Sequence, residues 1–451
     1  MSRPDPGVSP RFPMAFVYLY IVQLIFRPQD FSSPFMGWPM AWLTLFPGFF
    51  LGFMLNGEVL VRKKIPQFYL LPFFLGVIFI STVYNAGLAD FYPPTATFLK
   101  RILVFYMIVF LVDSEQKLRG VLTVFMALAG LLGVHAILQL TTGTGFGGIT
   151  PLMHYNPPRA VWCGEWDGSN SFGVIFLLAI PLCLEFLFSR SAPGQRIVAG
   201  VSLPLCAMGI YYVDSRGDTL ALMAAMLLYI AMRFSRKRVV LVMIMAFILT
   251  GAVLPSRMSK LTVSESSAHQ REWVWEQGID LLRDNPVLGV GPGKFVKHTE
   301  SGLIAHSNYV SIFSETGLTG FFGFMAILWF TFKELLMVNL GKNRDDDIDS
   351  IRMLVSRFFS NRADDGPGQG PDLTRALLCS LSGFCVATMF IVLLNDLLFF
   401  VLGLCAASYI ISRGAQGHVP LLFKRSDLRT VAALMAGVIF LYWLVAVYEI
   451  F

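Results

Sequence analysis

Long apolar runs recur along almost the whole chain and leave little sequence for a water-soluble domain. A run of about 17 to 25 mostly apolar residues is the length that an α-helix needs to cross a bilayer. The 451 residues are 55% hydrophobic and only 14% charged, whereas about a quarter of the residues in soluble domains are charged. The sequence therefore predicts an all-α polytopic membrane protein that forms a single integral membrane domain over residues 1–451.

The number of runs sets the expected number of spans. We expect about 12 to 13 transmembrane helices, with the uncertainty caused by two short runs. The predicted spans are 13–26, 37–55, 68–85, 98–112, 120–142, 171–188, 196–213, 217–234, 238–254, 308–339, 376–395, 397–412 and 431–449.

Charged residues orient these spans. Most Lys and Arg residues fall in alternate loops, including the long loop at 341–375, and such loops are cytoplasmic in membrane proteins. The N-terminus is then inside and the C-terminus outside. The large loop at 255–307 is predicted to be extracytoplasmic and partly helical, because Arg271, Trp275 and Gly278 recur at helical spacing.

Several cations break this pattern on the outer side. A guanidinium group binds phosphate with two hydrogen bonds and keeps its charge at physiological pH, so an outer cluster of Arg suits a phosphate group on a lipid carrier. The chain has no basic stripe with interleaved aromatic residues, and we expect no nucleic-acid partner. The outer cations are Lys100, Arg101, Arg159, Arg216, Arg257, Lys260, Arg271, Arg283, Lys294 and Lys297.

A charged break between two apolar runs is the first candidate site. Asp214-Ser215-Arg216-Gly217-Asp218 would place charges at bilayer depth, which is costly unless they face protein or water. Gly217 would permit a tight turn, Asp214 and Asp218 would orient Arg216, and the following helix could present its amides to an anion. The alternative is an ordinary hairpin in which Arg216 reaches the lipid headgroups.

Two later segments complete the candidate site. Residues 269–295 predict an amphipathic helix followed by Gly289, Gly291 and Gly293, which are only a weak indication of a phosphate cradle. The alternative is an interfacial helix anchored by its Trp residues. His306 precedes an apolar helix that carries Asn308, and its ordinary pKa near 6.5 suits a general base, although a structural role is the alternative.

The order of these motifs resembles the O-antigen ligase and polymerase superfamily of bacterial membrane glycosyltransferases. The resemblance covers roughly residues 98–405 and departs from the family where Ser307 separates His306 from Asn308, which puts the role of Asn308 in doubt. A weaker resemblance, at Arg27-Pro28-Gln29, is to the exosortase-associated branch of O-glycosylation ligases. The matching motifs are Ser215-Arg216-Gly217, Arg271 to Trp275, Pro286 to Phe295, His306 to Gly320, and Gly164 followed by Asn170.

The resemblance implies a GT-C-type fold with an active site that faces the periplasm from the bacterial inner membrane. Such an enzyme moves a glycan from undecaprenyl diphosphate to the hydroxyl of a lipid, glycan or protein acceptor. It implies that Arg216 and Arg271 bind the diphosphate and that His306 deprotonates the acceptor. We expect inversion at the anomeric carbon, no cofactor and no metal. The remaining candidates for binding the diphosphate or substrate are Lys100, Arg101, Arg159, Asp167, Asn170, Asp214, Asp218 and Asn308.

Two other functions fit parts of this pattern. A polymerase that extends a lipid-linked repeat uses the same donor headgroup and a hydroxyl nucleophile, so the motifs do not separate it from a ligase. A flippase for lipid-linked oligosaccharides would need cations along a pathway through both leaflets, whereas these cations gather on one side.

Overall fold

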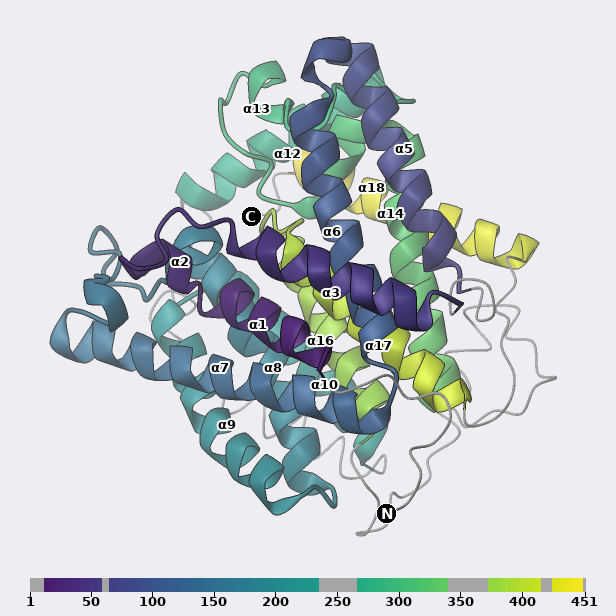
Figure 1. Cartoon of the computed structure of the whole chain (residues 1–451). Helices are drawn as coiled ribbons and strands as arrows, with labels where there is room; N and C mark the ends of the chain where they lie inside the picture. The colour runs from purple at the N-terminus through teal and green to yellow at the C-terminus, as the bar shows by residue number, and fades with distance from the viewer. Residues whose placement is uncertain (1–11, 59–64, 235–265, 340–371, 415–423, 449–451) are drawn as a thin grey trace.

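The computed structural model describes residues 12–58, 65–234, 266–339, 372–414 and 424–448, and the regular elements in these ranges are all helices (Figure 1). The first half contains α1 (Met14–Ile25), α2 (Pro28–Phe31), α3 (Met40–Asn56), α5 (Gln67–Ala86), η1 (Leu88–Asp90), α6 (Tyr92–Leu111), α7 (Glu115–Thr142), η2 (Phe146–Gly148), η3 (Gly164–Trp166) and α8 (Ser169–Phe188). The second half contains α9 (Pro193–Val213), α10 (Arg216–Arg233), α12 (Ser266–Asp284), α13 (Phe295–His298), α14 (Asn308–Asn339), α16 (Leu373–Ala387), α17 (Asp396–Gly414) and α18 (Arg425–Tyr448).

The helices bear out the prediction of an all-α polytopic membrane protein. Eight helices in the described ranges are long and apolar enough to cross a membrane, judged by length and composition, and α1, α3 and α16 are shorter apolar helices. Each predicted span overlaps a helix, except 238–254, which lies outside the described residues. The predicted loop at 255–307 contains α12 and α13 in its described part, whereas most of the predicted loop at 341–375 is not described.

Several helices begin or end five or more residues from the predicted boundary, and two of these differences change the expected positions of Lys100, Arg101 and residues 388–395. The predicted span 98–112 is the C-terminal part of α6, which begins at Tyr92 with prolines in its first turn, where a missing N–H is tolerated. Lys100 and Arg101 therefore lie about two turns inside the helix instead of opening it. The predicted span 376–395 is also too long, because α16 ends at Ala387 and residues 388–395 form an apolar loop.

Burial within the bundle distinguishes central from peripheral helices. In α8, 83% of the apolar window is buried inside the protein, against 28% in α9 and 22% in α18. Close packing of α7 on α9 depends on Gly130 and Gly133, because a methyl group there would lie 2.6 Å from the Ser202 hydroxyl and 2.4 Å from the Leu205 carbonyl oxygen. Small residues at a helix interface allow such an approach in a membrane.

Polar contacts join separate segments of the chain at the two ends of the bundle. At one end, the indole N–H groups of Trp162 and Trp166 donate to the carbonyl oxygens of Phe26 and Leu24, which attaches the α7–α8 loop to the end of α1. At the other end, the fully buried Glu185 of α8 accepts from the guanidinium of Arg375 of α16 at 2.9 Å. Figure 1 shows α12 and α13 together at the top of the view.

Candidate active site

The three side chains predicted to carry the chemistry come together from separate segments. Arg216 begins α10, Arg271 lies in α12, and His306 ends the loop before α14. Burial lowers the pKa of His306, and the charge of Arg271 lowers it further. Burial and the charge of Arg216 lower the pKa of Arg271 in the same way. Because such charge effects need proximity, these residues form one group, which we call the Arg–His cluster.

The indole of Trp275 fixes α12 beside the loop that carries His306. Its N–H donates to the carbonyl oxygen of Ala305 at 3.1 Å, and its ring packs edge-on against Tyr442 of α18 at 4.9 Å. Arg271 lies one turn before Trp275, so this hydrogen bond brings Arg271 and His306 together. Trp275 is 3% exposed and therefore a packing residue, while Trp273 is 44% exposed and fits the alternative of a headgroup anchor.

The backbone around His306 turns sharply into α14. His306 adopts the left-handed conformation at φ 49°. The next residue, Ser307, caps the helix, since its hydroxyl accepts from the amides of Tyr309 and Val310 at 3.2 and 3.4 Å and bonds the Tyr442 hydroxyl at 2.8 Å. The lowered pKa keeps the partly exposed imidazole neutral near pH 7, which is the form that accepts a proton.

Asn308, whose role the family pattern leaves in doubt, has a structural position in the fold. Its side-chain oxygen accepts from the backbone N–H of Leu393 at 2.6 Å, and its backbone N–H donates to the Thr388 carbonyl oxygen at 2.9 Å. Asn308 is completely buried. These bonds hold the non-helical loop 388–395, and such backbone is tolerated at membrane depth only where protein buries it.

The charged break at the start of α10 folds differently from the expectation in one respect. The tight turn is made by Asp214, which is left-handed at φ 48°, whereas Gly217 lies in the first helical turn. Asp tolerates this conformation better than most residues. Ser215 caps the helix by accepting from the Asp218 amide at 3.2 Å. Gly217 allows close packing, because an added methyl group would lie 3.2 Å from Phe390.

Arg159 joins this turn from the α7–α8 loop. Its Nε lies 3.8 Å from Oδ2 of Asp214, and its guanidinium stacks over the Tyr155 ring at 4.1 Å. An isolated antiparallel bridge to Leu152 fixes the segment. Tyr155 also interacts electrostatically with Arg271, which makes it a neighbour of the Arg–His cluster that we did not predict. The sequence feature that could have indicated Tyr155 is its place four residues before Arg159 in a polar outer loop.

The other predicted residues near α8 have different environments. Asp218 is 2% exposed and packs against Gly173, where a methyl group would lie 2.1 Å from its carboxylate. Asn170 lies one turn before Gly173 on α8. Asp167 follows η3 and is exposed, and no contact within the described ranges joins it to the Arg–His cluster.

Lys100 and Arg101 belong to a second charged group. Lys100 Nζ lies 2.9 Å from a carboxylate oxygen of Asp396, the first residue of α17, and Arg101 Nε lies 4.0 Å from the other oxygen. The Tyr20 hydroxyl donates to the same carboxylate at 2.8 Å. The buried Asp396 thus compensates these cations and ties α1, α6 and α17 together.

The glycine-rich turn after α12 is a structural clasp. The amides of Gly293 and Phe295 donate to the Glu315 carboxylate at 2.9 and 3.3 Å, and the Gly291 amide donates to the Glu315 carbonyl at 2.9 Å. Gly289 must lack a side chain, because a methyl group would lie 2.4 Å from the Glu315 backbone. These amides are occupied by α14, so the turn does not provide a phosphate cradle.

The remaining outer cations lie elsewhere. Arg283 pairs with Asp280 at 3.0 Å, and Lys294 lies 3.7 Å from Asp90. Lys297 is exposed in α13. Two predicted outer cations lie outside the described residues: Arg257 and Lys260.

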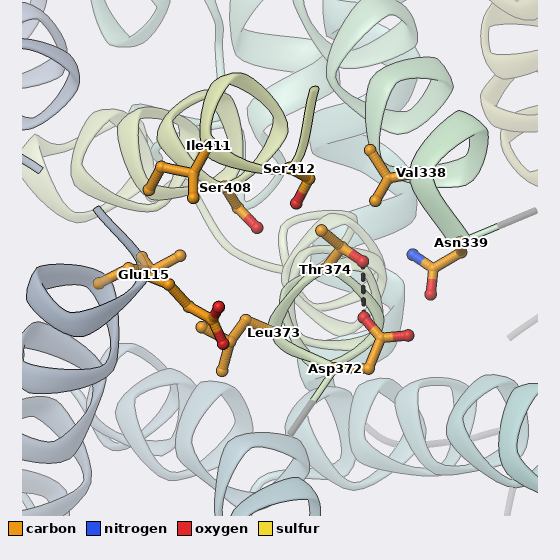
Figure 2. A pocket seen from close by; sticks show the side chains of 10 residues that line it. Glu115, Val338, Asn339, Asp372, Leu373, Thr374, Ser408, Ile411 and Ser412 are labelled. Atoms are coloured by element: carbon orange, nitrogen blue, oxygen red, sulfur yellow. Dashed lines mark hydrogen bonds between the residues drawn. The ribbon is translucent and has the colours of Figure 1, made fainter. Parts of the chain in front are cut away.

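A polar cavity lies at the far end of α14 from His306 (Figure 2). Its lining comes from the start of α7, the ends of α14 and α17, and the start of α16, and includes Glu115, Asn339 and Ser408. The hydroxyl of Thr374 donates to Asp372 there at 2.6 Å. The predicted site residues do not line it. Within the described ranges, no three His, Cys, Asp or Glu side chains are grouped to hold a metal ion, and metal independence stays a prediction.

Comparison with known proteins assigns the segment that carries the Arg–His cluster. Residues 201–325 match the family model described as O-antigen ligase. This range contains Arg216, Arg271 and His306, together with the clasp around Glu315. A search of curated proteins finds no match. The match over residues 201–325 supports the assignment of the chain to the O-antigen ligase and polymerase superfamily.

Proposed function

We propose that the chain is a membrane glycosyltransferase that moves a glycan from undecaprenyl diphosphate to an acceptor hydroxyl. The reaction would take place at the periplasmic face of the bacterial inner membrane, on a GT-C-like fold. The observation that carries the proposal is the convergence of Arg216, Arg271 and His306 from α10, α12 and the start of α14. The match to the O-antigen ligase family supports the reaction class.

The two guanidinium groups have the chemistry to hold and stabilise a diphosphate. Arg216 stands close enough to Arg271 to lower its pKa, and a dianionic headgroup between the two groups would relieve that repulsion. As the bond between the anomeric carbon and the diphosphate oxygen breaks, negative charge grows on the leaving group. Fixed cations stabilise this charge more strongly in a partly buried site than in water. Arg216 and Arg271 would therefore suffice to stabilise the departing diphosphate.

His306 has the chemistry of a general base. Its neutral imidazole would accept the proton of the acceptor hydroxyl while the oxygen forms a bond to the anomeric carbon. Attack from the side opposite the diphosphate inverts the configuration at that carbon. The imidazolium formed would lie near Arg271, so the developing negative charge of the diphosphate is needed to balance both cations.

The substitution His306→Ala tests this assignment. Loss of the base should reduce the rate of glycan transfer by about 10²–10⁴-fold, because that is the usual contribution of a positioned acid or base. The matched control is His298→Ala, which removes an exposed imidazole from α13 and should change the rate less than about twofold. The measurement is transfer by purified protein in nanodiscs, with lipid-linked donor and acceptor extracted from the native cell.

Normal transfer by His306→Ala would remove the base assignment, and a loss in both variants would indicate general damage to the fold. Ligase and polymerase are separated by the lipid-linked glycans in a deletion strain. Accumulation of full-length chains indicates a ligase, and accumulation of single repeats indicates a polymerase.

A further inference from the structure

Beside the Arg–His cluster lies a polar group that the proposed reaction does not use. Tyr155, Arg159 and Asp214 form it, with the guanidinium of Arg159 stacked over the Tyr155 ring at 4.1 Å and placed 3.8 Å from the Asp214 carboxylate. Arg159 and Asp214 are 7% and 5% exposed. The group comes from the α7–α8 loop and the α9–α10 turn, and it is therefore assembled only in the folded chain.

Two facing atoms of this group have unmet hydrogen-bonding capacity. Among the described residues, neither Nε of Arg159 nor Oδ2 of Asp214 has a hydrogen-bond partner, although both atoms are buried. At 3.8 Å they are too far apart to satisfy each other. A buried donor and a buried acceptor that stay unpaired each cost free energy. The arrangement therefore favours a ligand that both donates and accepts.

A sugar hydroxyl has this dual character, and a phosphate does not. The hydroxyl oxygen can accept from Arg159 while its proton is donated to Asp214. A phosphate would be attracted by Arg159 but repelled by the Asp214 carboxylate, which favours a neutral ligand at this position. The aromatic ring of Tyr155 adds a flat apolar surface next to these polar atoms.

The position of the group indicates which sugar it would bind. Tyr155 lies close enough to Arg271 to affect its pKa, and Asp214 lies two residues before Arg216, so the group borders both arginines of the proposed diphosphate site. The sugar nearest to those arginines is the one joined to the diphosphate. We propose that Tyr155, Arg159 and Asp214 form a sugar subsite for this first residue of the donor glycan, an inference that rests on the proposed function.

Binding of two kinds of lipid separates the sugar subsite from the diphosphate site. The probes are sugar-free undecaprenyl diphosphate and undecaprenyl diphosphate that carries a single N-acetylglucosamine, glucose or galactose. Their affinities are measured by microscale thermophoresis with the full chain in nanodiscs. We expect at least one sugar to tighten binding to the unmodified protein by about tenfold, in line with hydrogen bonds to charged groups.

Three variants should weaken binding of the sugar-bearing lipid more than binding of the sugar-free lipid, because each removes a group that would contact the sugar. Asp214→Asn keeps the size and tolerates the left-handed backbone, Arg159→Gln removes the charged donor, and Tyr155→Leu removes the ring. The matched control is Tyr84→Leu, at a tyrosine of α5 that is 76% exposed. Gel filtration and thermal unfolding check that each variant is folded.

Each outcome decides between the two proposals. Variants that keep the preference for the sugar-bearing lipid overturn the sugar subsite and leave donor binding intact. Variants that lose affinity equally for both lipids assign the residues to the diphosphate site and also overturn the subsite. If the unmodified protein binds every sugar-bearing lipid no better than the sugar-free one, the subsite is wrong. If it binds none of the lipids, the proposed function fails as well.

Discussion

The charge of Arg271 disfavours protonation of the His306 side chain. Burial and the neighbouring guanidinium both disfavour the protonated imidazole, and burial and Arg216 disfavour the charged form of Arg271. Cations that lie close together repel each other in a partly buried site. A diphosphate bound beside them, as proposed, would offset this repulsion.

The pH dependence of transfer should therefore respond to Arg271. Arg271→Gln removes the nearby cation, so the imidazolium of His306 is less disfavoured and its pKa rises towards the ordinary 6.5. The acid limb of kcat/KM, which reports the free enzyme, should move to higher pH. Arg271→Lys keeps the charge and should leave the limb in place. A limb that stays fixed in Arg271→Gln would contradict the coupling, whatever the loss in absolute rate.

At the scale of elements, two residues of α14 hold the loops that frame the site. Glu315 binds the amides of the glycine-rich turn, and Asn308 binds the loop 388–395. The glycine-rich motif and the Glu-Thr-Gly motif, which are separate in the sequence, are therefore two halves of one clasp. It connects the end of α12 to α14 and so helps to fix Arg271 relative to His306.

Breaking the clasp should destabilise the protein. Glu315→Ala leaves the amides of Gly293 and Phe295 without their acceptor, which should cost about 2 kcal/mol and lower the thermal unfolding temperature in detergent. Glu315→Gln keeps one acceptor oxygen, so its unfolding temperature should lie between those of Glu315→Ala and the unmodified protein. The control is Glu276→Ala, at an exposed position on α12. If Glu315→Ala unfolded at the same temperature as the control, the turn would have to be held by other contacts.

For the whole molecule, the sequence predicts the helices well because lipid imposes their length and apolar character. It misses the end of α16, since residues 388–395 are as apolar as a span, and the contacts of Asn308 and Tyr442 that hold this loop join residues far apart in the sequence. The motifs lead to Arg216, Arg271 and His306, which carry chemistry in short recognisable patterns. They do not reveal that Asp396 compensates Lys100 and Arg101, because that pairing depends on the packing of α6 against α17.

The sequence also does not predict the surroundings of Asp167 and Tyr155, because these depend on how the loops fold. Asp167 lies in a loop whose path is set by hydrogen bonds from Trp162 and Trp166 to α1, and sequence spacing does not specify that path. Tyr155 enters the site because Arg159 stacks over it, a contact between neighbours in a loop of irregular backbone.

The central claim is that the Arg–His cluster faces the periplasm, and labelling of introduced cysteines, with the Cys163→Ser protein as the background control, tests it most directly. In a Cys163→Ser background, Lys297→Cys introduces a thiol at an exposed position of α13, in the loop that leads to His306, and Arg190→Cys introduces one at an exposed position between α8 and α9. Spheroplasts of an expressing bacterium are treated with a membrane-impermeant maleimide before and after permeabilisation. The account predicts that Lys297→Cys is labelled in intact spheroplasts and that Arg190→Cys is labelled only after permeabilisation. The reverse pattern, or labelling of both from the same side, would contradict it.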